Sequence, residues 1–211
     1  MANILYSGPA DSRITFLFAH GAGAPMDSDW MNAMAERIGG RNIRVARFEF
    51  AYMAARRSGD GKRPPPAPAN RLIAEYLDVI ASLDNPGRLF IGGKSMGGRM
   101  ASMIAQKLYE TNGIAGLICL GYPFHPPGSP AKLRTDHLEK MTVPSLVCQG
   151  ERDPFGTREE VAAYPLPRAM RLLWLPDGDH DLKPRKASGL TLDQNLEAAA
   201  AGIAEFAREH A

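Results

Sequence analysis

The sequence predicts an α/β protein whose mostly parallel β-sheet, of six or seven strands, is covered by helices on both faces. Short apolar runs typical of buried strands alternate along the chain with segments whose apolar residues recur every three or four positions. Strands that alternate with helices in this way usually lie parallel in one doubly wound sheet. The 211 residues are enough for a core of their own, and we expect a single domain over residues 1–211.

Six strands are predicted from apolar runs that are short and continuous. Residues 4–7 add a candidate seventh strand at the edge of the sheet. In chain order, the six runs cover residues 14–19, 44–50, 88–91, 114–120, 145–149 and 171–175.

The helices are predicted from apolar periodicity and from capping residues. Trp30, Met34 and Ile38 recur at helical spacing after Asp27 or Ser28, either of which could cap that helix. The other helices are expected from Asn70 to Leu83, from Met96 to Tyr109, over residues 131–141, after the capping box Thr157–Glu160, and from the capping box Thr191–Gln194 to about Arg208.

Two segments interrupt this alternation and are predicted to be loops. Residues 52–69 are rich in Arg, Gly and Pro, and residues 121–130 in Pro and Gly. Each follows a strand, and open α/β sheets bind their ligands beyond the carboxyl ends of the strands. Residues that directly follow the strands are therefore the candidates for chemistry, and these two loops are candidates for shaping a pocket.

The composition argues against several classes of protein. A net charge of +2 gives no reason to expect a nucleic acid or a membrane as partner, and no apolar stretch approaches the roughly 18 residues of a membrane span. The N-terminal residues have no signal-peptide pattern. Cys119 and Cys148 lie in apolar runs, which is typical of small buried residues and not of a disulfide framework. These features favour a cytoplasmic protein.

Residues 91–100, IGGKSMGGRM, are compatible with two kinds of site. A phosphate-binding loop G-x-x-x-x-G-K-[ST] would need Gly at position 88, which is Arg88, and Gly87 stands one residue too early. The alternative is the G-x-S-x-G nucleophile elbow, in which a strand, a tight turn and a helix follow one another. That context is the predicted one here, so Ser95 is the candidate nucleophile.

The small residues around Ser95 have mechanical reasons in such an elbow. Gly93 and Gly97 remove side chains that would collide across the turn, and Gly98 lets the following helix lie close to the sheet. The positive end of that helix would also lie near Ser95, where negative charge develops during acyl transfer.

A serine nucleophile needs a base and an acid, which follow it in the order Ser, acid, His in this type of fold. His180 lies in the loop after the last predicted strand. Asp153 follows the preceding strand with the spacing of an acid loop, and Glu151 is the second candidate for the acid. Asp153 would hold His180 in one tautomer and stabilise the imidazolium.

Two backbone amides are expected to form an oxyanion hole. The Met96 amide, directly after the nucleophile, supplies one, and the Ala22 amide in the loop after the strand 14–19 is the best candidate for the other. His20 stands at the start of that loop, and we interpret it as a structural residue that shapes the loop.

At these residues the chain resembles the α/β-hydrolase superfamily over nearly its whole length. The segments FLFAHGAGAP, IGGKSMGGRMA, LGYPFHPPG, VPSLVCQGERDPFG and WLPDGDHDLK stand in the order of that family. More narrowly, GKSMGGR, GYPFHPP and DGDHDLK resemble a small bacterial branch that is related to the hydrolase-like domain of the third subunit of the animal NSL chromatin complex. The resemblance implies a catalytic set of Ser95, Asp153 and His180. Two features depart from the common pattern: Lys94 where many members have His, and no long helical lid between residues 120 and 145.

Several further residues are candidates for binding a substrate. Tyr52, Lys94, Tyr122, Phe124 and His125 follow strands at the expected ligand edge. Basic residues gather at the same edge, which would suit an anionic substrate if they are not simply solvated. They are Arg56, Arg57, Lys62, Arg63, Lys183, Arg185 and Lys186.

The function indicated is a serine hydrolase that cleaves an ester, thioester or similar acyl compound through an acyl-enzyme, with a small-molecule acyl substrate as partner and no metal or organic cofactor implied. The alternative is a non-catalytic interaction module, because hydrolase folds have been reused in that way and the related chromatin subunit is one context for it. The sequence retains all three members of the catalytic set, which favours catalysis.

Overall fold

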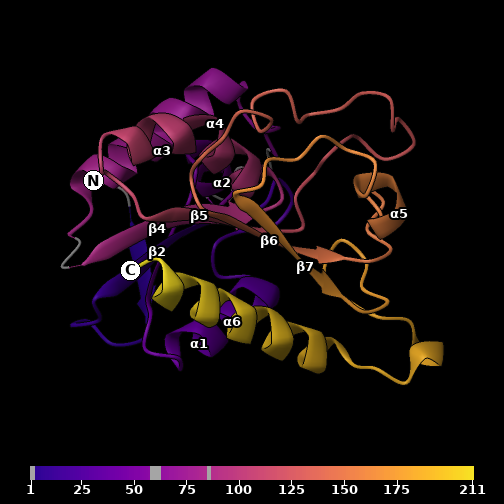
Figure 1. Ribbon diagram of the computed structural model, residues 1–211. Helices are drawn as coiled ribbons and strands as arrows, with labels where there is room; N and C mark the ends of the chain where they lie inside the picture. Colours follow the sequence, from indigo (N-terminus) through magenta and orange to yellow (C-terminus); the bar gives the residue numbers. More distant parts are fainter. Residues whose placement is uncertain (1–2, 58–62, 85–86) are drawn as a thin grey trace.

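The computed structural model describes residues 3–57, 63–84 and 87–211. These residues contain a seven-stranded sheet with the strand order β1-β3-β2-β4-β5-β6-β7 (Figure 1). Strand β1 pairs antiparallel with β3, and the other neighbouring pairs are parallel. The strands are β1 Ile4–Ser7, β2 Ile14–Ala19, β3 Arg44–Phe48, β4 Arg88–Lys94, β5 Gly116–Leu120, β6 Ser145–Gly150 and β7 Met170–Leu175. The predicted fold class is therefore confirmed, and residues 4–7 form the seventh, edge strand.

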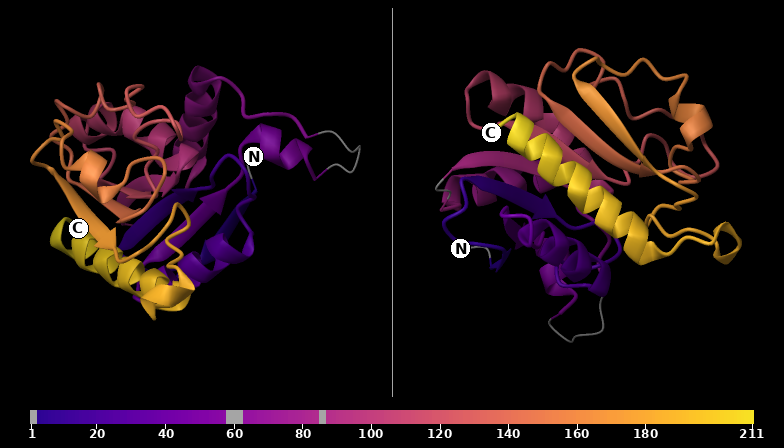
Figure 2. Two further views of the ribbon diagram at one scale, coloured as in Figure 1. Left: turned by 90° about the vertical axis from the view of Figure 1, so that its right-hand side faces the viewer. Right: turned by 60° about the horizontal axis from the view of Figure 1, so that its bottom comes forward.

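Helices cover both faces of this sheet. Helices α1 and α6 pack on one face, and α3 and α4 on the other (Figure 1). Figure 2 shows α6 lying obliquely across its face of the sheet. The helices are α1 Asp29–Gly39, α2 Ala51–Ala55, α3 Ala69–Ser82, α4 Met96–Glu110, α5 Arg158–Val161 and α6 Leu192–Glu209, with a short 3-10 helix at Lys186–Ser188.

The central strands are buried on both faces because each face carries its own core. Along β2, Phe16 and Phe18 belong to the core under α1 and α6, whereas Leu17 and Ala19 belong to the core under α3 and α4. This period of two is the strand geometry, and it explains why the sequence reads as a continuous apolar run. Burying each of the large side chains fully contributes about 1.5–3 kcal/mol.

Capping chemistry explains two of the helix starts. The Thr157 and Thr191 hydroxyls accept from the backbone N–H of Glu160 and Gln194, whose side chains reach back to the backbone N–H of the same threonines. Both predicted capping boxes are confirmed. The prediction that Asn70 caps α3 is wrong: that helix begins at Ala69, with Pro68 as its N-cap.

Three other element predictions are corrected by the structure. Residues 131–141 form turns and no helix, held by bonds such as Leu138 N–H to the Thr135 carbonyl, because burial of a few side chains overrides the weak helical pattern. Residues 52–55, predicted as the start of a loop, belong to α2, since Tyr52 and Met53 pack into the core there. Strand β4 continues through two glycines to Lys94 and does not end at Ile91.

The architecture brings the functional candidates to one edge of the sheet. The six strands β2 to β7 run parallel to one another, so the segments that follow them meet at their carboxyl ends. The β5–β6 connection over residues 121–144 contains no helix, which leaves the site without a helical lid. Among the described residues, no helix is both long and apolar enough to cross a membrane.

Candidate active site

Ser95 occupies a sharp turn between β4 and α4. It is the N-cap of α4, with φ +49° and ψ −113°, a backbone conformation that non-glycine residues rarely adopt. Such a conformation costs about 1–3 kcal/mol and persists only where the surrounding structure imposes it. The turn points the serine out of the strand end, at the start of the helix, as a nucleophile elbow requires.

The flanking glycines are required by close backbone contacts. A Cβ at Gly93 would lie 2.6 Å from the Ala19 carbonyl oxygen, and a Cβ at Gly97 would lie 2.6 Å from the His20 carbonyl oxygen. Both distances are shorter than real Cβ contacts, so any side chain there would force the elbow away from β2.

Ser95, His180 and Asp153 form one hydrogen-bonded chain. The Ser95 Oγ lies 2.9 Å from His180 Nε2, and His180 Nδ1 lies 2.8 Å from Asp153 Oδ2. The three residues follow β4, β7 and β6, and the most distant two, Ser95 and His180, are 85 positions apart in the sequence. In the tautomer that fits both bonds, Nδ1–H donates to Asp153 and Nε2 accepts from the serine hydroxyl.

Asp153 is fully buried, and its carboxylate accepts hydrogen bonds from two further donors besides His180. Its Oδ2 accepts from Gln149 Nε2 at 2.9 Å, and its Oδ1 accepts from the Phe155 backbone N–H at 2.9 Å. A buried carboxylate is tolerated only with such partners. The Phe155 ring lies against the imidazole of His180, with centroids 4.2 Å apart, and so fixes one side of it. The other acid candidate, Glu151, instead pairs with Arg158 at the surface.

The loop that begins at His20 is held from beneath by side chains. His20 is buried, accepts from the Phe50 N–H at Nε2 and donates from Nδ1 to the Gly21 carbonyl at 2.6 Å. Burial lowers the pKa of His20, which keeps it neutral. The Tyr52 hydroxyl donates to the carbonyls of Gly21 and Ala22, at 3.3 and 3.1 Å. Burial raises the pKa of Tyr52 to about 12, so the hydroxyl stays protonated and remains a donor.

Lys94 is buried next to the elbow and is engaged with the His180 loop. Its ammonium donates to the His180 carbonyl oxygen, lies 3.1 Å from Asp181 Oδ1, and sits 5.3 Å from the centre of the Trp30 ring. Burial lowers the pKa of Lys94, and the Asp181 carboxylate opposes that shift. The side chain therefore connects the end of β4 to the loop that carries His180.

Ser95 lies between two hollows that share Ala22, Ser95 and Phe155. The first, the His180 hollow, has a volume of about 570 Å³ and is lined by the loop after β2, the start of α1, Lys94 and His180. The second, the Arg99 hollow, has a volume of about 320 Å³ and is lined by the start of α3, the first turn of α4 and residues 123 and 134 of the β5–β6 connection. A substrate bound at Ser95 can therefore extend in two directions.

Three of the candidates for substrate binding lie in the core and line neither hollow at Ser95. Tyr122, Phe124 and His125 are each at most 2 % exposed. Gly121, with φ +63°, turns the chain inward after β5, and the two aromatic rings then pack beneath the loops. His125 Nε2 lies 3.4 Å from Glu160, away from Ser95. The expectation that these three residues bind the substrate is therefore corrected.

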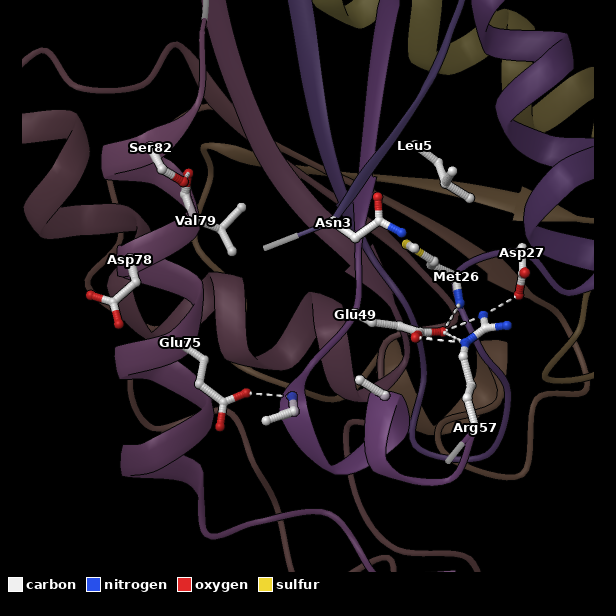
Figure 3. Close-up of a pocket in the computed structure, with 12 residues that line it drawn as sticks. Asn3, Leu5, Met26, Asp27, Glu49, Arg57, Glu75, Asp78, Val79 and Ser82 are labelled. Atoms are coloured by element: carbon white, nitrogen blue, oxygen red, sulfur yellow. Dashed lines mark hydrogen bonds and ion pairs between the residues drawn. The ribbon is translucent and has the colours of Figure 1, made fainter. Parts of the chain in front are cut away.

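The basic residues expected at the ligand edge of the sheet mostly have other partners or lie away from Ser95. Figure 3 shows Arg57 held between Asp27 and Glu49 in a separate hollow of about 690 Å³ beside β1 and α3. Arg56 donates to the Pro64 carbonyl, and Arg185 pairs with Asp177. Lys62 lies outside the described residues, while Lys183 and Lys186 are exposed and line neither hollow at Ser95.

Four residues at the site were missed by the sequence reasoning. Phe155 and Gln149 flank Asp153 closely in the chain, and that proximity was the available signal. Arg99 stands four positions after Ser95, one helical turn away, which is a signal of the same kind. Arg134 gives no such signal, because only the path of the β5–β6 connection brings it to the Arg99 hollow. Within the described part of the chain, no three His, Cys, Asp or Glu side chains are grouped as a metal site.

The fold and the site together define a class, the α/β hydrolases: a mostly parallel sheet with an elbow serine after a central strand. The model of the alpha/beta hydrolase domain family matches residues 12–208, and the chain belongs to this family.

Solved structures from three bacteria share the fold. The chain is similar to Est1E from Butyrivibrio proteoclasticus, with a TM-score of 0.70 and 16% identity over 97% of this chain and 94% of that one. It is similar to a dienelactone hydrolase from Anabaena variabilis, with a TM-score of 0.71 and 20% identity over 99% and 92% of the two chains. It is also similar to a serine hydrolase without lid from Xanthomonas campestris, with a TM-score of 0.68 and 18% identity over 98% and 89%. At these identities the likeness shows the fold.

Proposed function

We propose that this protein is a serine hydrolase that cleaves a carboxylic ester or thioester through an acyl-enzyme, with Ser95, His180 and Asp153 as its catalytic residues. The observation that carries the proposal is the continuous hydrogen-bonded chain from Ser95 Oγ through His180 to Asp153, at 2.9 and 2.8 Å. Such a chain activates a hydroxyl that is otherwise a poor nucleophile.

In the first half of the reaction, Ser95 Oγ attacks the carbonyl carbon and its proton passes to His180 Nε2. The carbonyl π electrons move to the oxygen and form the oxyanion. When this intermediate collapses, the bond to the leaving oxygen or sulfur breaks, and the leaving group takes the proton from Nε2. The acyl group is then bound to Ser95 as an ester.

In the second half, water attacks the acyl-enzyme and gives its proton to His180 Nε2. Collapse of this second intermediate releases the carboxylic acid, and the proton returns from Nε2 to Ser95 Oγ. Asp153 remains ionised throughout, because its role is to orient the imidazole and to stabilise the imidazolium.

The oxyanion is stabilised in this proposal by the amides of Met96 and Ala22. Both residues line the Arg99 hollow beside Ser95, and among the described residues neither amide donates to a protein acceptor. Because a trans peptide points its N–H opposite to its C=O, the bonds from His20 and Tyr52 to the Gly21 carbonyl direct the Ala22 N–H away from them. The N-terminus of α4 adds its positive end at the same place.

The class of substrate is supported by the nature of the structural neighbours. One is Est1E with ferulic acid bound, another is a dienelactone hydrolase, and a third is a thermophilic esterase from Thermogutta terrifontis. The narrower resemblance to the bacterial branch related to the chromatin subunit, and with it the alternative of a non-catalytic interaction module, stays a prediction from the sequence.

The proposal is tested by hydrolysis of p-nitrophenyl acetate and of a matched thioester. We expect the wild type to hydrolyse at least one of them, and Ser95→Ala and His180→Ala to lose activity by at least about 10³-fold. Asp153→Asn should lose activity by a similar order, because it leaves His180 in the wrong tautomer. Glu151→Gln is the matched control and should keep the wild-type rate. A folded wild type without activity on either substrate would favour the interaction module.

A further inference from the structure

Two arginines line the Arg99 hollow, which shares Ser95 with the His180 hollow but is not lined by the histidine. Arg99 belongs to the first turns of α4, four residues after Ser95, and Arg134 comes from the β5–β6 connection. Both residues are half-buried. Neither was among the basic residues expected to serve an anionic substrate, and most of that group is paired or points elsewhere.

These two guanidinium groups lack acidic partners. In the part of the chain that the structure describes, neither forms an ion pair, and the buried Nε of Arg99 has no hydrogen-bond acceptor at all. Burial and then the charge of Arg99 lower the pKa of Arg134, and no carboxylate compensates them. By contrast, Arg57, Arg158 and Arg185 are each neutralised by carboxylates. Buried guanidinium donors are normally satisfied, so this pair is suited to an acceptor that a ligand brings.

The direction of a bound substrate follows from the chemistry of His180. The histidine must protonate the leaving group, so the leaving group must lie on its side of Ser95. His180 lines the His180 hollow and does not line the Arg99 hollow. The acyl part of the substrate, which stays on the serine, is then directed into the Arg99 hollow.

The walls of the Arg99 hollow suit a short acyl chain with a charged end. Apart from Ser95 and the arginines, the lining is largely apolar, with Leu72, Met100 and Pro123 among its members. Two planar guanidinium groups match a planar carboxylate, which they can bind with paired hydrogen bonds. The volume of about 320 Å³ leaves room for a few methylene groups and a carboxylate.

We propose that Arg99 and Arg134 bind a carboxylate at the far end of the acyl group, so that the preferred substrates are half-esters or half-thioesters of short dicarboxylic acids. This inference rests on the proposed hydrolase function and adds the substrate class. The products are the free dicarboxylate and the alcohol or thiol of the leaving group.

The test compares matched pairs of substrates. The monoethyl esters of succinic, glutaric and adipic acid are each compared with the same ester whose free carboxylate is replaced by an uncharged carboxamide. For at least one pair we expect the wild-type kcat/KM to favour the carboxylate by about tenfold or more, as for a lost hydrogen bond to a charged group. Because the result is a ratio of two substrates on one sample, loss of folded protein cancels.

The variants then assign the preference to the two arginines. Arg99→Gln and Arg134→Gln should each bring the ratio toward one. Arg13→Gln is the matched control: it removes the same charge from an exposed arginine just before β2, at the opposite edge of the sheet, and should keep the wild-type ratio.

Three results would overturn the inference. If the wild type hydrolyses the carboxamide esters in a Ser95-dependent way but prefers the carboxylate in none of the three pairs, or if both glutamine variants keep the preference, the inference is wrong while the proposed function stands. If the wild type hydrolyses neither these esters nor p-nitrophenyl acetate or the matched thioester, the proposed function fails and the inference fails with it.

Discussion

Replacement of Gly121 by alanine should distinguish an effect on the position of His180 from an effect on the stability of the fold. It follows β5 with φ +63°, and a Cβ there would lie 2.8 Å from the His180 carbonyl oxygen, 3.0 Å from Lys94 Nζ and 3.3 Å from His180 Nδ1. Gly128 in the same connection has φ +70°, and a Cβ there would meet nothing within 4 Å. The two alanine variants therefore share the backbone strain, and only one disturbs the histidine.

The strain of a left-handed alanine is about 1–2 kcal/mol, so both variants should lose that much free energy of unfolding. For a chain of this size, each kcal/mol lowers Tm by about 2–4 °C, which thermal unfolding resolves. In Gly121→Ala the His180 loop must also move by several tenths of an ångström. Misplacement of this order can cost up to about 10²-fold in rate, so we expect kcat/KM on p-nitrophenyl acetate to fall 10- to 100-fold.

Gly128→Ala should keep kcat/KM within about twofold of the wild type at a temperature where both are folded. The reasoning is refuted if Gly121→Ala and Gly128→Ala have the same activity, because the contact with His180 would then have no catalytic consequence.

Three further outcomes are expected. Ser95→Gly and Ser95→Ala both lack the nucleophile, but Ser95→Gly should be more stable to urea by about 1 kcal/mol because glycine adopts the positive φ without strain. Equal stabilities of the two variants would contradict the claim that the backbone at Ser95 is strained. Tyr52→Phe loses the hydroxyl that donates to the Gly21 and Ala22 carbonyls and so holds the loop of the Ala22 amide. It should lower kcat about five- to tenfold with KM little changed. An effect on KM alone would instead assign Tyr52 to substrate binding. Burial lowers the folded-state pKa of His20, so the unfolded state binds more protons as the pH falls below 6.5, and the free energy of unfolding falls by at most about 1.4 kcal/mol per pH unit. His20→Gln should therefore lose less stability than the wild type between pH 7.5 and 5. The same dependence of unfolding free energy on pH in both proteins would contradict this.

The fold was predictable because its signals are local. Buried parallel strands such as Ile14–Ala19 read as continuous apolar runs, and the capping boxes at Thr157 and Thr191 involve only neighbours in the chain. The placement of Ser95, Asp153 and His180 was predictable for a related reason. Each follows its own parallel strand, so the topology alone brings all three to one edge of the sheet.

Side-chain direction and charge pairing were not predictable from the sequence. Tyr122, Phe124 and His125 also follow a strand, but Gly121 turns them into the core. Arg57 looked like a residue of the site, yet Glu49 and Asp27 hold it in another hollow. Which arginines remain unpaired depends on how the folded chain places the carboxylates, as it does for Arg57 and Asp27, which are 30 positions apart in the sequence.

The contacts of Lys94 with the His180 loop were likewise not predictable from the sequence. The sequence placed a cation directly before the nucleophile and left open whether it is solvated, packed or available to a substrate. The structure commits its ammonium to the His180 carbonyl and to Asp181, two groups that lie 86 and 87 positions away in the chain. An isolated motif cannot contain that information.

The central claim, that Ser95 is an activated nucleophile, is tested most directly by covalent labelling with a fluorophosphonate followed by peptide mass spectrometry. We expect a single label on Ser95 in the folded wild type, none in Ser95→Ala, and labelling slowed by at least about tenfold in His180→Ala. A folded wild type that does not react, or a label that persists in Ser95→Ala, would contradict the claim.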